Sequence, residues 1–187
     1  MVATGDATQL LALWSAGDAI ALNQVVELLY DQMHRIAKIQ MRSEQEVSFQ
    51  PAELVNDVYL RLIQLNRIQV SDRAHFLALF SRMARQTLVD EARKRHAQMR
   101  DQALNVTLNE DFAPAITGKF RLIELDELMN QLALVDAVAS EVVELRIFAG
   151  LSIQEVAAHL KLSEATISRK WRSGKAWLGK SLGRSQP

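Results

Sequence analysis

Apolar residues recur every three or four positions along most of this chain, which is the spacing of one face of an α-helix. The longest such stripe consists of Leu22, Val25, Val26, Leu29, Tyr30, Met33 and Ile36. Only three prolines and seven glycines interrupt 187 residues, so few positions force a helix to end. Since 49% of the residues are hydrophobic, the helices can bury a packed core. The sequence therefore predicts an all-α fold.

Several residues mark where these helices begin and end. Gly17 is expected to stop the first helix and Asp18 to cap the second. Pro51 suits the first turn of a third helix, and either Ser71 or Asp72 can cap the fourth. A further helix is expected over residues 137–149, and Ser152-Ile153-Gln154-Glu155 has the pattern of a capping box.

Residues 101–120 lose the helical periodicity and contain two asparagines, a proline and a glycine. A segment of this length without a helix is long for an interior loop, so it is predicted to be a linker. The chain is then divided into two helical domains, residues 1–100 and 121–187, joined by a flexible linker.

Charge is distributed in blocks, although 22 basic and 22 acidic side chains give a net charge of zero. Residues 73–100 hold seven bases and two acids, and residues 161–187 hold seven bases and one acid. The segments that precede them are acidic: five bases and nine acids over residues 1–72, and three bases and ten acids over 101–160. The two basic blocks are candidates for contact with nucleic acid.

The second basic block begins with a tight turn, Lys161-Leu162-Ser163, which joins two short predicted helices, one over residues 153–160 and one from Glu164. Ile167, Trp171, Gly174 and Leu178 share the inner face of the second helix, whereas small, polar and arginine side chains point outward. A helix-turn-helix protein places such an outer face in the DNA major groove. Lys161 stands where such turns often have glycine, and a left-handed lysine would cost about 1 kcal/mol.

The first basic block forms a helix with one apolar face, which includes Phe76 and Phe80. Its other face carries Arg82, Arg85, Arg93, His96 and Arg100, so the helix could offer arginines to phosphates. The alternative interpretation is an ordinary solvated basic face.

Other classes of protein are disfavoured by what the sequence lacks. Without cysteine there is no disulfide or thiolate metal site, which fits a reducing cytoplasm. No apolar run could span a bilayer, and no cofactor-binding motif is present. A metal-dependent hydrolase would need ligands among His34, His75, His96 and His159, with Glu53 and Asp57, but their spacing matches no metal site.

Three segments together resemble the extracytoplasmic-function (ECF) group of bacterial RNA polymerase sigma factors, over residues 6–183. Residues 53–62 (ELVNDVYLRL) resemble the helix of this family that binds core polymerase, and residues 76–95 resemble its promoter-melting helix. Residues 150–172 resemble its −35-reading motif. The resemblance implies a non-enzymatic, cytoplasmic subunit without cofactors, which binds the β′ clamp and β flap of core polymerase and promoter DNA.

The resemblance also suggests which residues carry each role. At the −35 element, Thr166, Ser168 and Arg169 are expected near base edges, and Ser163, Arg172 and Lys175 near phosphates. Around the −10 element, the expected contacts come from Asn66, Arg73, His75, Phe76, Arg82, Arg85, Arg93 and Arg100. Phe76 could stack on an unpaired base or pack in the core, which its place on the apolar stripe favours. Core polymerase is expected to contact Glu53, Leu54, Asp57, Val58 and Arg61.

The chain departs from the family at the start of the polymerase-binding helix, where relatives carry a dense acidic cluster. Here the sequence Ser48-Phe49-Gln50-Pro51-Ala52-Glu53 holds one acid. Depleted clusters are associated with activation by a Ser/Thr kinase, and Ser48 is the nearest hydroxyl. Our hypothesis is that Glu53 supplies the negative charge instead, and the alternative is that it only stabilises the helix N-terminus. An anti-sigma factor is a further expected partner.

Two further hypotheses remain at this stage. A stand-alone helix-turn-helix regulator would share the C-terminal motif but would not need a basic helix followed by an acidic linker. The opposite charges of neighbouring blocks would also permit the two domains to pack together in the free chain and hide both DNA-binding faces.

Overall fold

The computed structural model describes residues 4–41, 50–65, 69–98, 105–107 and 119–184. Within these residues the elements are α1 (Thr4–Ser15), α2 (Ala19–Met41), α3 (Pro51–Ile63), α4 (Arg73–Gln98), β1 (Asn105–Thr107), β2 (Lys119–Arg121), α5 (Leu122–Val135), α6 (Ala137–Val143), the π-helical turn η1 (Glu144–Phe148), α7 (Ile153–Leu160) and α8 (Glu164–Arg184). The fold is all-α apart from one short β pair, as predicted.

Helices α1–α4 form an N-terminal bundle around the predicted apolar stripes. Leu22, Val25 and Met33 of α2 are buried, together with Phe76 and Phe80 of α4. The ring of Trp14 in α1 meets Phe76 edge-on, with ring centroids 6.0 Å apart. Each helix therefore contributes one apolar face to a common core, as the periodicity indicated.

The predicted helix ends of this bundle are confirmed. Gly17 follows α1 with a φ of 104°, a conformation that favours glycine. Asp18 caps α2, because its Oδ1 accepts a hydrogen bond from the Ile20 amide at 2.8 Å. Pro51 is the first residue of α3. Asp72 caps α4 through the His75 amide, at 2.9 Å.

The predicted linker over residues 101–120 falls largely outside the described residues. Near its two ends the chain forms β1 and β2, which pair antiparallel with Val106 opposite Phe120. The sequence did not suggest these strands, because three-residue strands are too short to display an alternating pattern.

Helices α5–α8 with η1 form a C-terminal bundle. The helix expected over 137–149 is not a uniform α-helix: α6 ends at Val143 and the chain continues as η1. In η1 the hydrogen bonds span five residues, as in the bond from the Ala149 amide to the Glu144 carbonyl at 3.2 Å. Such π-turns occur often at functional sites. Here the turn contains Glu144, Leu145, Ile147 and Phe148, all of them buried.

The helix-turn-helix predicted from the sequence is present as α7 and α8. Ser152 and Glu155 form the expected capping box, with the Ser152 amide 2.8 Å from Glu155 Oε2 and the Glu155 amide 3.2 Å from Ser152 Oγ. Ser163 caps α8 by accepting from the Thr166 amide at 3.2 Å. Lys161 adopts the left-handed conformation, with φ 54° and ψ 39°, that the turn requires.

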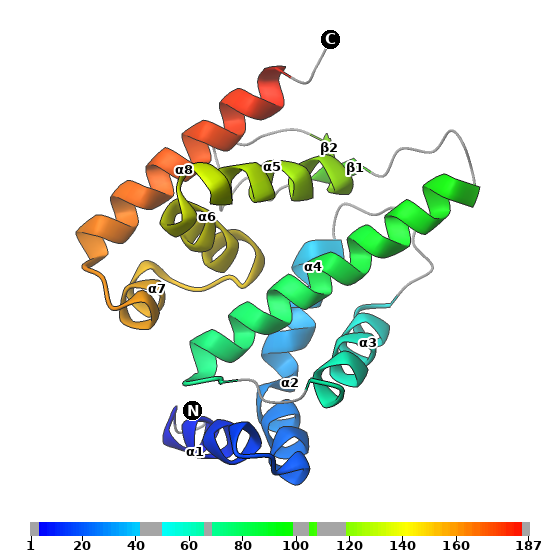
Figure 1. Ribbon diagram of the computed structural model, residues 1–187, viewed down its shortest axis with the longest axis vertical. Helices are drawn as coiled ribbons and strands as arrows, with labels where there is room; N and C mark the ends of the chain where they lie inside the picture. Colours follow the sequence, from blue (N-terminus) through cyan, green and yellow to red (C-terminus); the bar gives the residue numbers. More distant parts are fainter. Residues whose placement is uncertain (1–3, 42–49, 66–68, 99–104, 108–118, 185–187) are drawn as a thin grey trace.

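The two bundles pack directly against each other. Helix α4 contacts α2 and α3 on its own side, and α5, η1 and α7 of the C-terminal bundle. Figure 1 shows α4 crossing the molecule between these two groups of helices, with α8 on the far side of the C-terminal bundle. The arrangement that the opposite charge blocks would permit is therefore observed.

Gly174 allows the close approach of α8 to α6. A Cβ at this position would lie 2.6 Å from Val143 Cγ2 and 3.3 Å from the carbonyl oxygen of Ala139. We expect Gly174→Ala to lower the free energy of unfolding by about 1–2 kcal/mol, although alanine favours a helix, because overpacking costs about 1–3 kcal/mol. Urea denaturation measures this. The exposed neighbour Ser173→Ala is the control, and a Gly174→Ala protein as stable as that control would contradict the close packing.

Candidate nucleic-acid interface

The outward face of α8 is the more accessible of the two predicted DNA-binding surfaces. Ile167, Trp171 and Leu178 are buried on the inner face, as predicted. Arg169 and Arg172 are exposed on the outer face. Helix α8 packs against α5, α6 and α7 of its own bundle, so its outer face stays open to solvent.

Three of the four other residues predicted to contact the −35 element are partly engaged within the protein. The Ser163 and Thr166 hydroxyls are 2.9 Å apart and share a hydrogen bond at the start of α8. Lys175 is half-buried, and its Nζ lies 4.8 Å from the centre of the Trp171 ring. Ser168 is half-buried on the outer side. Among the predicted −35 contacts, the exposed cationic groups are therefore those of Arg169 and Arg172.

The arginine face of α4 has a different environment, because its arginines form ion pairs with acids of the C-terminal bundle. We call the contact surface between α4 and the C-terminal bundle the seam. Its ion pairs are Arg73–Glu155 (3.0 Å), Arg82–Glu141 (3.1 Å), Arg85–Asp126, Arg85–Glu144 (3.0 Å) and Arg93–Asp126 (3.9 Å). Four of the arginines predicted to meet −10 DNA thus face carboxylates in this structure. The hypothesis that packing hides both basic faces holds only for part of α4. Arg85 is 11% exposed, but Arg82 and Arg93 are each 50% exposed, and the outer face of α8 stays open.

Arg85 lies at the centre of the seam. Its side chain is 11% exposed, and its two terminal nitrogens bind Asp126 and Glu144, which are 6% and 3% exposed. The guanidinium carbon also lies 5.5 Å from the centre of the Phe148 ring. On its other oxygen, Glu144 accepts a hydrogen bond from the buried Ser81 hydroxyl at 3.4 Å. This cluster combines high burial with charge pairing, so it is the most specific contact between the bundles.

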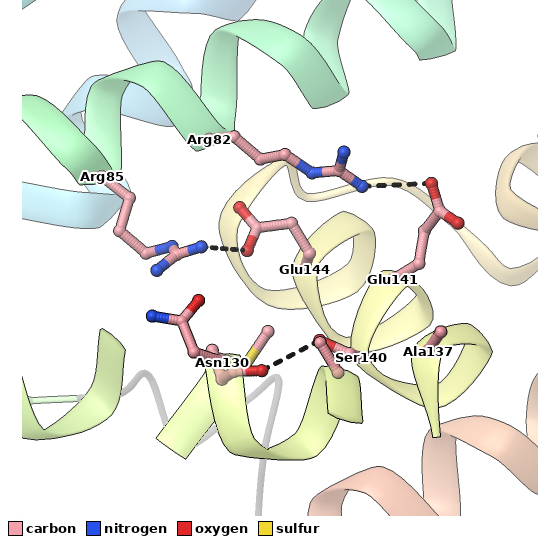
Figure 2. Close-up of a pocket in the computed structure, with 9 residues that line it drawn as sticks. Arg82, Arg85, Asn130, Ala137, Ser140, Glu141 and Glu144 are labelled. Carbon is pink, nitrogen blue, oxygen red and sulfur yellow. Dashed lines mark hydrogen bonds and ion pairs between the residues drawn. The ribbon is translucent and has the colours of Figure 1, made fainter. Parts of the chain in front are cut away.

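A pocket of about 370 Å³ opens beside this cluster, between α4 and the C-terminal bundle. Figure 2 shows Arg82 and Arg85 reaching down from α4 toward Glu141 and Glu144, with Asn130 and Ser140 on the opposite wall. Because both arginines already pair with acids, the pocket presents no uncompensated cation to a ligand.

The beginning of α4 forms a second part of the seam. Arg73 donates from Nε to Gln32 Oε1 at 2.7 Å and from Nη1 to Glu155 Oε1 at 3.0 Å. Burial alone would raise the pKa of Glu155, but hydrogen bonds from the Ser152 amide and Arg73 bring it below its ordinary value. Glu155 therefore both caps α7 and ties the two bundles together.

His75 and His159 meet across the seam, although they are distant in sequence. Their ring centroids are 5.4 Å apart, and His159 Nδ1 lies 3.7 Å from Asp72 Oδ1. Burial lowers the pKa of His75, and the neighbouring His159 lowers it further. Sequence spacing missed this pair, since only the packing of α4 on α7 brings the rings together.

Several predicted −10 contacts need correction or lie outside the described residues. Phe76 is 0% exposed in the core, so it has no surface for stacking on a base in this structure. Arg73 and His75 lie in the first turn of α4. Asn66 and Arg100 lie outside the described residues.

The predicted polymerase-binding residues on α3 divide into two groups. Leu54 and Val58 are both 0% exposed and belong to the core of the N-terminal bundle, so in this structure neither can touch a partner. Glu53 and Asp57 are exposed on the opposite side, and Arg61 lies 3.7 Å from Asp90 of α4. The sequence analysis missed two exposed apolar side chains on α3, Leu60 (56% exposed) and Ile63 (50%). Both residues lie outside the apolar stripe of α3, and this position predicts that their side chains are exposed.

Glu53 also has a local role. Its Oε2 accepts a hydrogen bond from the Gln50 amide at 2.7 Å, at the N-terminus of α3. Through this contact Glu53 stabilises the N-terminus of α3, which is the alternative to the hypothesis that its charge binds core polymerase. Ser48 lies outside the described residues.

No cluster of three or more metal-ligating side chains occurs among the residues that the structure describes. His34 stacks on Tyr30 within α2, away from the His75–His159 pair. In the same part of the chain, no helix is long and apolar enough to cross a membrane.

An all-α protein with an exposed, basic second helix in a helix-turn-helix belongs to a class of DNA-binding proteins. The chain matches the family model described as ECF sigma factor over residues 4–184. It therefore belongs to the ECF sigma factors, non-enzymatic proteins that act in transcription initiation. No curated protein matches the chain.

The lowered pKa of His75 predicts a pH dependence of stability. Because protonation is easier in the unfolded chain, the free energy of unfolding should decrease as the pH falls below 6.5, the ordinary pKa of histidine. We expect a loss of about 0.5 kcal/mol between pH 7.5 and 5.5, since solvent screens a half-exposed group. Denaturant titrations at both pH values measure it. His75→Asn should reduce the difference and His34→Asn should retain it; an equal effect of the two would contradict this origin.

Proposed function

We propose that this sigma factor joins core RNA polymerase and directs it to promoters by reading two DNA elements. The observation that carries the proposal is the outer face of α8, where Arg169 and Arg172 are exposed on a helix whose other face anchors it in the bundle. A helix presented in this way fits the major groove of the −35 element. The N-terminal bundle would then engage the −10 element.

On α8 the residues would divide between specificity and positioning. Arg169, Thr166 and Ser168 would approach base edges, because arginine can bind guanine with two hydrogen bonds and hydroxyls can serve several bases. Arg172, Lys175 and Ser163 would hold phosphates, which fixes the register of the helix without reading sequence.

The −10 element would be engaged by α4 and the segment that precedes it. Arg82, Arg85, Arg93 and Arg100 would follow the DNA backbone, while the segment from Asn66 to His75 would receive a base extruded from the opening duplex. Three of these arginines pair with acids in the seam, so this role requires the seam to separate.

Core polymerase would bind the exposed face of α3. Glu53, Asp57 and Leu60 lie on one side of this helix, with Ile63 next to them. An apolar patch flanked by acids suits a basic groove with an apolar floor, which we assign to the β′ clamp. The C-terminal bundle would contact the β flap. An anti-sigma factor or a Ser/Thr kinase is proposed as the regulator.

The first test is run-off transcription with core polymerase on promoters selected by the reconstituted holoenzyme. We expect Arg169→Ala to reduce transcription about tenfold and to relax the preference for bases in the −35 element, because a lost base contact costs about 1–3 kcal/mol. Arg172→Ala should weaken all promoters to a similar degree and reduce the salt dependence of binding.

The exposed Glu127→Gln on α5 is the control for a surface charge change, and it should leave transcription unchanged. Failure of the wild-type chain to support transcription with saturating core polymerase would contradict the proposed function. That result together with sequence-specific binding by the free chain would favour a stand-alone regulator.

A second test separates the two roles of Glu53. Glu53→Gln keeps a side-chain oxygen that can cap α3 but removes the charge, whereas Glu53→Ala removes both. If the charge contacts core polymerase, both variants should bind it several-fold more weakly in a pull-down, with the Ala variant also less stable by about 1 kcal/mol. Wild-type affinity in the Gln variant would limit Glu53 to the cap.

A further inference from the structure

We propose that Asp136 is a positioning residue for α8, because its ion pair with Lys170 fixes how far this helix is turned about its own axis. That rotation determines where Arg169 points, and therefore which base of the −35 element it can reach. The reading of the −35 element by α8 rests on the proposed function above. The ion pair itself is a contact between described residues.

Asp136 is held in place by the two helices that it separates. It is the single residue between α5 and α6. Its amide donates to the Leu132 carbonyl at 2.8 Å, and its own carbonyl accepts from the Ser140 amide at 2.9 Å. Its side chain caps α6, because Oδ1 accepts from the Ala139 amide at 3.0 Å. A residue held by three hydrogen bonds has a defined position, so it can serve as a fixed point for a third helix.

The second carboxylate oxygen of Asp136 reaches α8. Lys170 Nζ donates to Oδ2 at 2.7 Å, and the two side chains are 31% and 30% exposed. The hydrogen bond from Lys170, followed by the one from the Ala139 amide, holds the pKa of Asp136 below its ordinary value. A partly exposed ion pair adds little to stability, so its removal should leave the fold intact. Its effect is then expected in the orientation of α8.

The ion pair acts beside the closest contact between α6 and α8. Gly174 lies one turn after Lys170 on the same side of α8, next to Val143 and the Ala139 carbonyl. This close approach sets the distance between the helices, but glycine has no side chain that could oppose a rotation. The ion pair adds a directed contact from Lys170 to the N-cap of α6. Two contacts one turn apart therefore hold α8 at one distance and one angle.

A small rotation of α8 is enough to change a base contact. A helix with its side chains has a radius of about 5–6 Å, so a rotation of about 10° displaces its surface by about 1 Å. Hydrogen-bond lengths vary over only about 0.5 Å. The buried side chains of Ile167, Trp171 and Leu178 anchor α8, but apolar packing is not directional. Because Lys170 follows Arg169 in the sequence, a movement at the ion pair directly displaces the arginine.

Three substitutions separate the charge of the pair from the cap. Asp136→Asn keeps an oxygen that can cap α6 and removes the charge, Lys170→Met removes the cation, and Lys170→Arg keeps an ion pair. Holoenzyme assembled from the full chain and core polymerase is tested for binding to a selected promoter and to versions with each −35 base changed. The base position that Arg169 reads is the one at which Arg169→Ala loses discrimination.

At that position we expect Asp136→Asn and Lys170→Met each to reduce discrimination between bases about three- to tenfold. The double variant should lose no more than either single variant, because both substitutions break the same contact. Lys170→Arg should retain the discrimination of the wild type. Discrimination that the double variant loses additively would contradict a role of the pair as one unit.

Glu127→Gln on α5 and Lys38→Met on α2 are the matched controls. Each removes one charge at an exposed position outside the ion pairs of the described residues. Both should keep the wild-type base preference. Circular dichroism and urea denaturation show whether each variant is folded. A loss of stability in Asp136→Asn or Lys170→Met without a change in base preference would overturn the positioning role.

The outcomes also distinguish this inference from a direct DNA contact and from the proposed function. If Lys170→Met weakens every promoter equally and lowers the salt dependence of binding, while Asp136→Asn does neither, Lys170 is a phosphate contact and the inference is overturned. Unchanged base preference of both variants, with a wild type that reads the −35 element, overturns the inference alone. A free wild-type chain that binds promoter DNA but supports no transcription, with altered base preference in the variants, would support the inference and contradict the proposed function.

Discussion

The arrangement of the two bundles depends on the burial of one guanidinium. Arg85 is nearly enclosed, and a charge in that position is tolerated only when counter-ions and hydrogen bonds replace the water it has lost. Asp126 and Glu144 supply both, and Phe148 covers the group from the side. Because two acids from different elements must converge on one cation, few relative placements of the bundles satisfy all three charges.

The other ion pairs of the seam contribute to the packing of the bundles mainly in combination with the Arg85 cluster. Arg82–Glu141 is half-exposed, and pairs of that kind contribute little by themselves. With Arg85 held in place, these pairs match positive charge on α4 with negative charge on the C-terminal bundle along the helix. The matched region runs from Glu155, near the first turn of α4, to Asp126, opposite Arg93. These acids neutralise arginines of α4 that would otherwise repel one another, so the match of charge favours the observed packing of the two bundles.

The sequence predicted local structure correctly where that structure depends on a few neighbouring residues. The caps at Asp18 and Ser152 and the left-handed Lys161 each depend on a few neighbouring residues. The apolar stripe of α8 follows directly from helical periodicity. Periodicity also accounts for Leu54 and Val58 of α3, because their place on the apolar stripe requires burial in this structure. The same stripe leaves Leu60 exposed.

By itself, the sequence determined the helices, the helix-turn-helix and the division of charge into blocks, since these follow from spacing along one chain. Only the tertiary structure decided which acids meet which arginines, why Glu144 lies in a π-turn, and why the arginines of α4 have acidic partners while Arg169 and Arg172 of α8 stay exposed. The charge blocks indicate that the two bundles can attract each other. Which residues form ion pairs is determined by the packing of α5, η1 and α7 on α4. That packing brings residues 41 to 82 positions apart within hydrogen-bonding distance, and no local pattern encodes such contacts.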